Sequence, residues 1–389
     1  MTGARATACV IGSMDLVRPL GLSGIPCVVV VEPGDAACYS RFTHGAIELA
    51  HPRREAGVLL ERLSEWARTQ AEPPVLFYGQ DAALLFVSRH RERLAEAFRF
   101  VIADPELVED LVDKARFRAL ARRLDLPVPE TVSVDASVVS PGDLELRFPL
   151  VVKPAAHERG NWAAVAGDAK ALGAPTAAEL RAIWPRLARE GLDVLVQEMV
   201  PGPESRMESY HVYVDAAGGV VAEFTGRKLR TDPPAYGETT ALEITGARDV
   251  AELGREVTRR LDLTGVAKLD FKRDAAGGLH LLEVNPRFNL WHHPGARAGV
   301  NLPAFVYADL VGRPRPGVQA ARPGVRWVYH ARDARAARRQ GVPVHRWIPW
   351  AVTSEAKAVV ALDDPLPAVM GGLARVGARL GLGPRARRR

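Results

Sequence analysis

Apolar and polar positions along the first hundred residues alternate as in a sheet covered by helices. Four apolar runs have the length of a strand: residues 7–12, 26–31, 75–78 and 100–102. Helical spacing is present in the segments between them, most clearly over residues 58–69 and 82–98. Strands that alternate with helices predict a parallel sheet, and no Gly-x-Gly-x-x-Gly follows the first strand. We expect a Rossmann-like domain over residues 1–105 without an NAD site.

Beyond this domain, proline and glycine punctuate the pattern. One long amphipathic helix is predicted from Pro105 to the break at Pro127-Val128-Pro129, and a short strand follows over residues 131–134. Residues 148–154 (FPLVVKP) read as a buried strand that places Lys153 near its end. A lone buried ammonium costs several kcal/mol, so its partner comes from the fold or from a ligand. The alternative is a lysine that extends to the sheet edge.

In two later segments, a predicted strand is followed directly by polar residues. Residues 194–197 (VLVQ) lead into Pro201-Gly202-Pro203-Glu204, where backbone groups at the strand end could read the edge of an adenine. Taken alone, the same residues also fit an ordinary turn. Residues 210–214 and 220–225, joined by Asp-Ala-Ala-Gly-Gly, predict a hairpin that leads into the cationic segment 226–230 (GRKLR).

The most informative segment is 266–288 (VAKLDFKRDAAGGLHLLEVNPRF), which predicts two strands joined by a turn with paired glycines. Side chains alternate between the faces of a strand. One face is predicted to carry Lys268, Asp270, Lys272, Leu281, Glu283, Asn285 and Arg287. The other face is predicted to be an apolar backing of Ala267, Leu269, Phe271, Leu282 and Val284.

The polar face of this hairpin suggests a metal site. The turn brings Asp270 opposite Glu283, with Asn285 and Arg287 just beyond. Oxygen ligands beside cations suit Mg²⁺ held between carboxylates and a phosphate chain, because Mg²⁺ takes few protein ligands. We predict Asp270, Glu283 and Asn285 as ligands of one or two Mg²⁺ ions, with Mn²⁺ as a substitute. A solvated hairpin with chance ion pairs is the alternative.

Composition narrows the class of protein. The chain has 389 residues, 47% apolar and 25% charged, which predicts a soluble protein of two or three domains. No apolar run approaches the roughly 20 residues of a membrane span, and no signal peptide is apparent. Three cysteines without metal-ligand spacing indicate a reducing cytoplasm. Four arginines of an expected disordered tail, residues 385–389, supply most of the net charge of +6, which argues against nucleic-acid binding.

Lysine is rare in this chain, which has 45 arginines and seven lysines. Lysine is therefore expected where a compact, flexible ammonium is needed and a planar guanidinium is not suitable. Four of the seven lysines fall inside motifs: Lys114, Lys153, Lys228 and Lys268.

The motifs occur in a fixed order. Asp113-Lys114, the Lys153 strand, the Gln-Glu-Met-Val-Pro-Gly-Pro-Glu hinge, Lys228 and the carboxylate hairpin follow one another. This series resembles the ATP-grasp superfamily, and closely its carboxylate–amine ligase branch. The likeness extends over residues 7–312 and includes Ser40-Arg41, the Tyr-Gly-Gln-Asp that ends at Asp81, and residues 298–312 as a closing helix. The Asp-Pro-Leu-Pro at 364–367 resembles the C-terminal tail of this branch.

The resemblance implies an α/β and α+β fold. A Rossmann-like pre-ATP-grasp domain (1–105) would precede an ATP-grasp domain (106–312) that binds ATP between two α+β subdomains, 106–200 and 201–312. Residues 313–389 would form a small extension with a disordered basic tail. Within it, the segment 327–350 predicts a strand, a basic helix and a second strand, whose use as a lid or dimer contact is open.

The resemblance also assigns roles to single residues. The implied ATP-binding residues are Lys114, Lys153, Gln197, Glu198, Met199, Val200, Glu204 and Lys228. Lys268 and Arg287 would be catalytic, stabilising the oxyanion at the acyl centre. Candidate substrate residues are Arg227, Arg230, His292 and His293, whereas adjacent histidines are a poor zinc site. One departure is the segment after Lys153, where His157, Glu158 and Arg159 stand in place of a glycine-rich loop.

The implied reaction is ATP-dependent C–N bond formation. A carboxylate would attack the γ-phosphate to give an acyl phosphate and ADP, and an amine would then displace phosphate. The expected partners are small molecules, an amino acid or natural-product acid and an amine, with a homodimer as a further expectation. The alternatives are a biotin-type carboxylase, a carbamoyl-phosphate-type enzyme and a non-catalytic ATP-binding protein. No biotin-acceptor Met-Lys-Met and no internal repeat is present.

Overall fold

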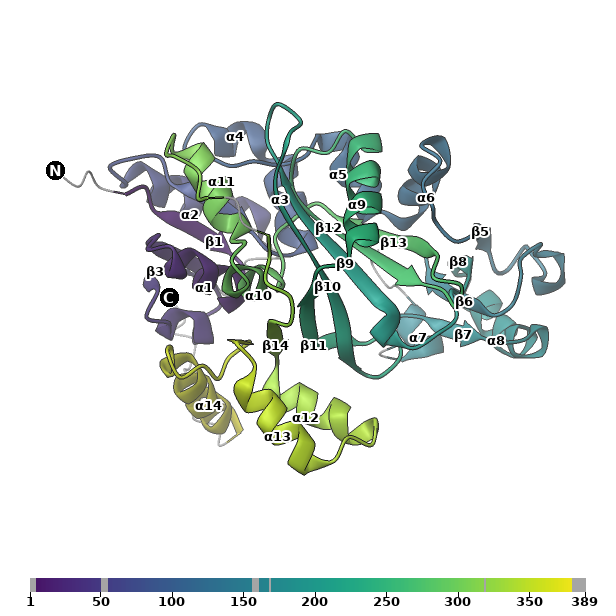
Figure 1. The fold of residues 1–389 in the computed structure, drawn as a ribbon. Coiled ribbons are helices and arrows are strands. Elements are labelled where there is room, and N and C mark those ends of the chain that lie inside the picture. The colour runs from purple at the N-terminus through teal and green to yellow at the C-terminus, as the bar shows by residue number, and fades with distance from the viewer. Residues whose placement is uncertain (1–4, 50–54, 156–160, 168, 318–319, 380–389) are drawn as a thin grey trace. The chain divides into compact units, whose positions relative to one another are not determined.

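The computed structural model describes residues 5–49, 55–155, 161–167, 169–317 and 320–379. The chain forms two compact units. The elements of both are labelled in Figure 1. The first unit contains residues 1–102, 287–331 and 348–389, and the second contains 103–286 and 332–347. The segment predicted as a C-terminal extension is thus divided between the units. The predicted domain boundaries at residues 105 and 312 remain expectations.

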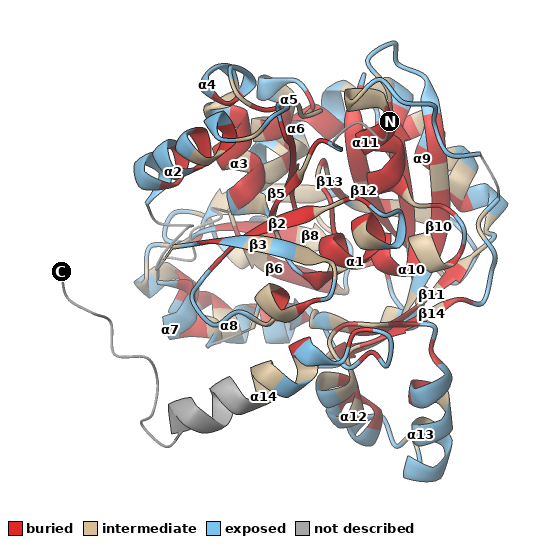
Figure 2. Cartoon of the chain, turned by 90° about the vertical axis from the view of Figure 1, so that its left-hand side faces the viewer, coloured by how far each residue is buried: buried red, intermediate tan, exposed pale blue. Residues whose placement is uncertain are grey.

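The first unit contains a parallel sheet in the order β3-β2-β1-β4, as predicted. Its strands are β1 (Ala8–Ile11), β2 (Cys27–Val31), β3 (Thr43–Glu48) and β4 (Val75–Tyr78). Strand β3 was not predicted, because it is a half-exposed edge strand with few apolar residues, whereas β2 is fully buried (Figure 2). The strand predicted at 100–102 is wrong, since only Arg99 bridges to Val75.

Helices connect the strands of this sheet. They are α1 (Met14–Leu22), α2 (Ala56–Arg68), α3 (Asp81–Arg89) and α4 (Arg91–Ala95). The helix predicted over 82–98 is therefore two helices that meet at His90. Later segments of this unit add α10 (His292–Arg297), α11 (Leu302–Leu310), α14 (Leu366–Arg379) and the parallel pair β14 (Arg326–Val328) and β15 (Ala356–Lys357).

A buried ion pair joins the two ends of the first unit. Arg18 of α1 is 2% exposed, and its Nε lies 3.2 Å from Oδ2 of Asp364. The same carboxylate accepts hydrogen bonds from Ser40 Oγ and Arg41 N, both at 2.9 Å. Both motifs noted in the sequence, Ser40-Arg41 and Asp364-Pro-Leu-Pro, are therefore parts of one packing contact.

The second unit contains two antiparallel sheets. The smaller has the order β5-β8-β6-β7, formed by β5 (Thr131–Asp135), β8 (Asp193–Glu198), β6 (Leu150–Pro154) and β7 (Leu172–Ala174). Helices α7 (Trp162–Ala166) and α8 (Ala177–Arg189) cover its core through Trp162 and Trp184. The long helix predicted from Pro105 is wrong. It is two helices, α5 (Pro105–Val112) and α6 (Lys114–Arg123), because the extended Asp113 caps α6 by accepting from Ala115 N and Arg116 N.

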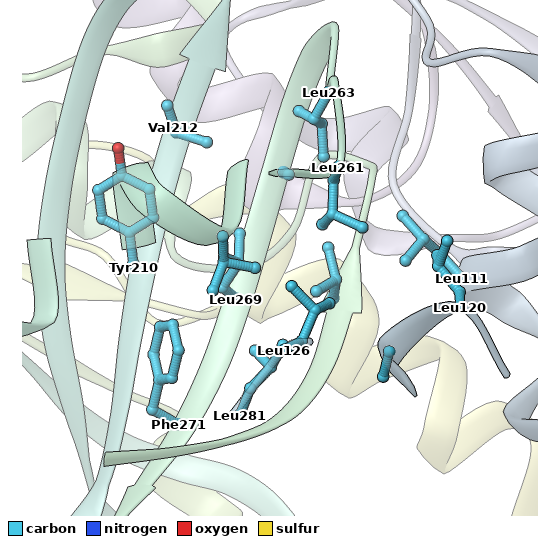
Figure 3. Close-up of a cluster of buried hydrophobic side chains, with 14 of the residues drawn as sticks. Leu111, Leu120, Leu126, Tyr210, Val212, Leu261, Leu263, Leu269, Phe271 and Leu281 are labelled. Atoms are coloured by element: carbon cyan, nitrogen blue, oxygen red, sulfur yellow. The ribbon is translucent and has the colours of Figure 1, made fainter. Parts of the chain in front are cut away.

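The larger sheet runs β13-β12-β9-β10-β11 within this unit. Its strands are β9 (Met207–Val214), β10 (Val220–Asp232), β11 (Glu238–Thr245), β12 (Gly265–Arg273) and β13 (Leu279–Asn285). Helix α9 (Arg248–Arg260) packs on β9 and β10, and its Val250 and Val257 belong to the core there. Leu111 and Leu120 bring α5 and α6 to the same cluster (Figure 3). The apolar backing of the hairpin is thus the main core of the second unit.

The predicted hairpin is confirmed, with one correction to its faces. Asp270 pairs with Glu283, but the next residue, Phe271, pairs with Leu281, so Leu282 is an extra residue in β13. This bulge reverses the alternation beyond it. Leu281 is therefore fully buried in the core, and Leu282 is only half-buried, the opposite of the prediction.

The C-terminal half of the segment 327–350 also differs from its prediction. A helix, α12 (His330–Arg339), follows β14 as expected, but the second predicted strand is helix α13 (Val344–Thr353). Among the described residues, no helix is long and apolar enough to cross a membrane.

Helix α9 approaches β9 so closely that Gly254 is required. A Cβ at Gly254 would overlap the ring of the buried Tyr210. We expect Gly254→Ala to lower the free energy of unfolding by about 1–3 kcal/mol, because the overlap outweighs the better helix propensity of alanine. Gly57→Ala in α2, where a Cβ meets nothing, should instead raise it by about 0.5–1 kcal/mol. Urea unfolding would measure both, and equal effects would contradict the close packing.

Candidate active site

Two carboxylates and an ammonium lie together on the polar face of the hairpin. Lys268 Nζ lies 2.5 Å from Asp270 Oδ2 and 3.6 Å from Glu283 Oε1. Asn285, which pairs with Lys268 across the two strands, donates its amide to Glu283 Oε1 at 3.1 Å. The four predicted residues of the hairpin are therefore adjacent, and a cation already lies between the two carboxylates.

Asp270 is the buried centre of this group. Its side chain is 1% exposed and accepts a hydrogen bond from Ser209 Oγ of the neighbouring strand β9. Lys228 Nζ of β10 lies 3.9 Å from its Oδ2. Burial alone would raise the pKa of Asp270, but the ammonium groups of Lys268 and Lys228 hold this pKa well below its usual range. Asp270 therefore stays ionised at neutral pH.

The oxygen atoms of this hairpin fit a small divalent cation. Asp270, Glu283 and Asn285 supply two carboxylates and one amide oxygen, which are hard ligands of the kind Mg²⁺ accepts. No group of three His, Cys, Asp or Glu that could hold a metal is found in the described residues. A metal here would accordingly need the Asn285 oxygen or oxygens from a substrate.

A second lysine lies in the smaller sheet. Lys153 Nζ donates to Gln197 Oε1 at 2.8 Å, and Gln197 Nε2 donates to Thr131 Oγ1 at 2.9 Å. Burial lowers the pKa of Lys153 to about 8, against a smaller opposing effect of the Glu283 carboxylate. Lys114 Nζ donates to the carbonyl oxygen of Pro154 at 3.2 Å, so both lysines lie at the end of β6. No carboxylate of the described residues forms an ion pair with Lys153, so an anionic ligand would suit this lysine.

The hinge after β8 has fewer open backbone groups than the sequence suggests. The N–H of Glu198 donates to Glu130 O, and that of Met199 donates to Pro149 O, both at 2.8 Å. The Glu198 side chain is held by Arg147, with Nη2 2.9 Å from Oε2. In the described part of the chain, the N–H of Val200 donates to no acceptor, which makes it the hinge donor best suited to a ligand.

Glu204 lies beside the hinge and close to a further lysine. Its Oε1 is 4.0 Å from Nζ of Lys272. Tyr236, in the loop between β10 and β11, donates a hydrogen bond from its hydroxyl to Met199 Sδ at 3.2 Å. Burial raises the pKa of Tyr236, and the nearby Glu204 carboxylate raises this pKa further. Tyr236 has a φ of 57°, a left-handed conformation that non-glycine residues seldom adopt outside constrained sites.

Both candidate substrate arginines are engaged in ion pairs of the second unit. Arg227 pairs with Glu243 at 3.1 Å and is half exposed. Arg230 binds Asp333 of α12 in a bidentate manner, at 2.8 and 2.7 Å. Asp333 is fully buried and also accepts from Thr240 Oγ1 and Trp347 Nε1, both at 2.8 Å. We conclude that Arg230 holds α12 on the sheet.

The remaining candidates belong to the first unit. Arg287 Nε lies 2.5 Å from Oδ1 of Asp81. His292 and His293 of α10 are buried, and burial, followed by nearby guanidinium groups, lowers the pKa of each to about 3. Both imidazoles are therefore neutral at physiological pH. His157, Glu158 and Arg159 lie outside the described residues.

Sequence reasoning missed three residues of this site: Ser209, Thr131 and Tyr236. Ser209 and Thr131 contact Asp270 and Gln197 only because strands distant in sequence pair side by side. A loop tyrosine carries no local signal of this kind. Knowledge of the strand order would have been needed to find them.

Comparison with known proteins finds similarity in sequence and in fold. Residues 192–332 match the family described as ATP-grasp in the biosynthetic pathway with Ter operon. The fold is similar to biotin carboxylase from Campylobacter jejuni (TM-score 0.63, 14% identity, 83% of this chain and 74% of that one). It is also similar to L-amino acid ligase from Bacillus licheniformis (TM-score 0.59, 14% identity, 81% and 76%). The chain has the ATP-grasp fold, and part of it matches an ATP-grasp family.

Relatives that match this chain in sequence include amino-acid ligases. D-aspartate ligase of Enterococcus faecium is 29% identical over 234 residues, 58% of this chain and 56% of that protein. D-alanine–D-alanine ligase of Stutzerimonas stutzeri is 27% identical over 179 residues, 45% and 54%. The chain thus spans little more than half the length of these relatives. The ATP-grasp fold predicted from the motifs is confirmed.

The lowered pKa of Lys153 predicts a pH dependence of nucleotide binding. The ammonium form is the one that attracts phosphate, so affinity for ATP should fall as the pH rises through about 8. Binding should also take up a proton near this pH, because the phosphates favour the charged lysine. Calorimetry in buffers of different ionisation enthalpy would measure the uptake. Lys153→Arg should abolish it, and uptake that persists in this variant would contradict the assignment.

Proposed function

We propose that this ATP-grasp protein is an ADP-forming carboxylate–amine ligase that makes an amide bond through an acyl phosphate. The observation that carries the proposal is the Asp270–Glu283–Asn285 group with Lys268 and Lys228 around it. Such a surface places one buried carboxylate, that of Asp270, one exposed carboxylate, that of Glu283, and flexible cations where a polyphosphate and its metal would both be stabilised. The relatives, which are named for D-aspartate and D-alanine ligation, support an amino acid as a substrate.

Residues of the smaller sheet would bind ATP. Lys153 and Lys114 are proposed to contact phosphate oxygens, since both place an ammonium at the end of β6, where Lys114 donates to Pro154 O and Lys153 donates to Gln197 Oε1. Gln197 and the Glu198–Val200 backbone are proposed to bind the adenine, with the Val200 N–H as the donor. Glu204 would bind the ribose hydroxyls, beside Tyr236.

The hairpin residues would hold Mg²⁺, our proposed metal. Bound there, a divalent ion would neutralise charge on the phosphates. Lys228 is proposed to reach the β- and γ-phosphates from β10. Lys268 competes with any other cation for the same two carboxylates, so its release from them would provide an ammonium for the reaction centre.

The proposed reaction has two steps, phosphoryl transfer to the carboxylate and then amide formation. An oxygen of the substrate carboxylate attacks the γ-phosphorus, the bond to the β-phosphate oxygen breaks, and ADP leaves. The amine nitrogen then attacks the acyl carbon, phosphate leaves, and the nitrogen loses a proton. Lys268 and Arg287 are proposed to stabilise the oxyanion of the second step, where one well-placed donor contributes roughly 3–4 kcal/mol. We propose that the reaction takes place in the cytoplasm, on small molecules.

The first test is analysis of the nucleotide product. Purified protein with Mg-ATP, pooled D- and L-amino acids and hydroxylamine should form ADP and an amino-acid hydroxamate, because hydroxylamine captures an acyl phosphate. AMP with pyrophosphate would contradict the mechanism. Bicarbonate-dependent ADP formation without hydroxamate would favour a carboxylase, and ATP binding without turnover of any acid would favour a non-catalytic protein.

Asp270→Asn tests the carboxylate centre in the same assay. We expect turnover to fall by at least about 10³-fold, because the substitution removes the buried charge that Lys228 and Lys268 surround. Asp262→Asn is the matched control, since Asp262 is exposed and Asn tolerates its φ of 48°. Equal turnover in the two variants would exclude a role for Asp270.

Lys268 gives a test that needs no turnover. Lys268→Met should raise the affinity for Mn²⁺ without nucleotide by roughly tenfold or more, because an internal competitor of the carboxylates is removed. The same variant should lose ligase activity. Electron paramagnetic resonance of Mn²⁺ would measure binding, with the exposed Lys170→Met as control. Unchanged or weaker Mn²⁺ binding in Lys268→Met would contradict the competition.

A further inference from the structure

A group of charged side chains lies in the first unit, and none of its members is assigned to ATP or metal. We refer to it as the α10 cluster, formed by Arg18, His293, Arg297, Lys357, Asp363 and Asp364. Helix α10 packs against α1 and β15, which brings these residues together. The electrostatic environment of His293 includes Arg18, Arg297, Lys357 and Asp363, so the members lie within range of one another.

Arg18 and Asp364 have a structural role within the cluster. Arg18 is 2% exposed and bound to Asp364, and its Nη1 and Nη2 donate to the carbonyl oxygens of Ala358 and Val359 at 3.1 and 2.9 Å. Arg18 therefore fixes the segment after β15 to α1. Its donors and its charge are satisfied, and it needs no ligand.

Arg297 and His293, in contrast, have buried polar atoms without a hydrogen-bond partner among the described residues. Nη2 of Arg297 pairs with Asp363, but Nε of Arg297 is buried and has no hydrogen-bond partner among the described residues. Both ring nitrogens of His293, which is 1% exposed, are likewise without a partner there. Buried polar atoms left in this way indicate a bound water or ion that the contacts of the chain do not supply.

The net positive charge of the cluster favours an anion as its ligand. Three cations, Arg18, Arg297 and Lys357, face two carboxylates, Asp363 and Asp364. A third carboxyl, Asp15, lies near Arg18, but burial raises its pKa to about 7, so the surplus of one positive charge is complete only below that pH. The flanking Arg41, which donates to Asp363 O, and Glu355 offset each other. The Lys357 ammonium donates to one carbonyl, that of Ser354, at 2.5 Å.

The cluster is also accessible. The side chains of Arg297 and Asp363 are 30% and 43% exposed, so the cluster reaches the protein surface, whereas Arg297 Nε and His293 are buried. We propose that the α10 cluster binds a small monocarboxylate, held by Arg297 Nε, an N–H of the neutral His293 and the Lys357 ammonium. A single negative charge balances the surplus, and guanidinium and imidazole N–H groups suit a planar carboxylate. A phosphate dianion would exceed the available charge.

This inference does not depend on the ligase proposal, and its test contains neither ATP nor metal. The thermal unfolding of the full chain would be followed with sodium acetate, D-alanine, D-aspartate, sodium phosphate and sodium chloride at equal ionic strength. Acetate or an amino acid should raise the Tm above the value in chloride by about 3 °C at roughly ten times its dissociation constant. Acetate probes a simple carboxylate, and a larger effect of D-alanine would identify an amino acid as the source; either supports the site.

Variants assign the effect to the cluster. Arg297→Lys keeps the charge opposite Asp363 but removes the Nε–H, and Lys357→Met removes the ammonium; each should abolish the carboxylate-specific shift. Arg315→Gln, which breaks the Arg315–Asp309 pair (2.6 Å) elsewhere in the same unit, should leave the shift unchanged. A Tm in carboxylate equal to that in chloride, a response to phosphate alone, or a shift that persists in both variants would overturn the proposal.

Discussion

The burial of the Asp270 carboxylate is the constraint on which the second unit depends. An ionised carboxylate away from water is stable only with cations and hydrogen-bond donors in contact with it. Three adjacent strands supply them: Lys228 from β10, Ser209 from β9 and Lys268 from β12 itself. The order β12-β9-β10 of the larger sheet is therefore also the order in which this site is assembled.

The same hairpin has to serve a core on its other face. Leu269, Phe271 and Leu281 are fully buried against α9 and neighbouring strands. A strict alternation from Glu283 would have turned Leu281 toward the polar face. The bulge at Leu282 resolves this conflict, because it keeps Glu283 opposite Asp270 and returns Leu281 to the core. One extra residue thus reconciles the site with the packing.

The pattern of the sequence was sufficient to predict features whose residues lie close together along the chain. The hairpin, its turn and its metal-type side chains lie within one continuous segment, so alternation and residue type predicted them. The bulge could not be read in this way, since an extra residue leaves no mark on composition. Likewise, Asp113 interrupts a continuous helical pattern only because its side chain caps α6.

Partners distant in sequence were beyond prediction for the same reason. Arg230 looked like a substrate residue until Asp333, 103 residues away, was found in contact with it. The positions of Ser209 and Tyr236 beside the site depend on the strand order and on the conformation of a loop, which the sequence pattern does not predict. The ATP-grasp fold itself was predictable, because its motifs occur along the chain in a fixed order.

The central claim is that Asp270, Glu283 and Asn285 hold the metal that accompanies ATP. Anomalous diffraction from crystals grown with Mn²⁺ and a non-hydrolysable ATP analogue tests it most directly. We predict a Mn²⁺ peak within roughly 2–2.5 Å of oxygen atoms of these residues, with Lys268 Nζ displaced from between the carboxylates. Nucleotide bound with its Mn²⁺ on other residues, and Lys268 still between Asp270 and Glu283, would contradict the account.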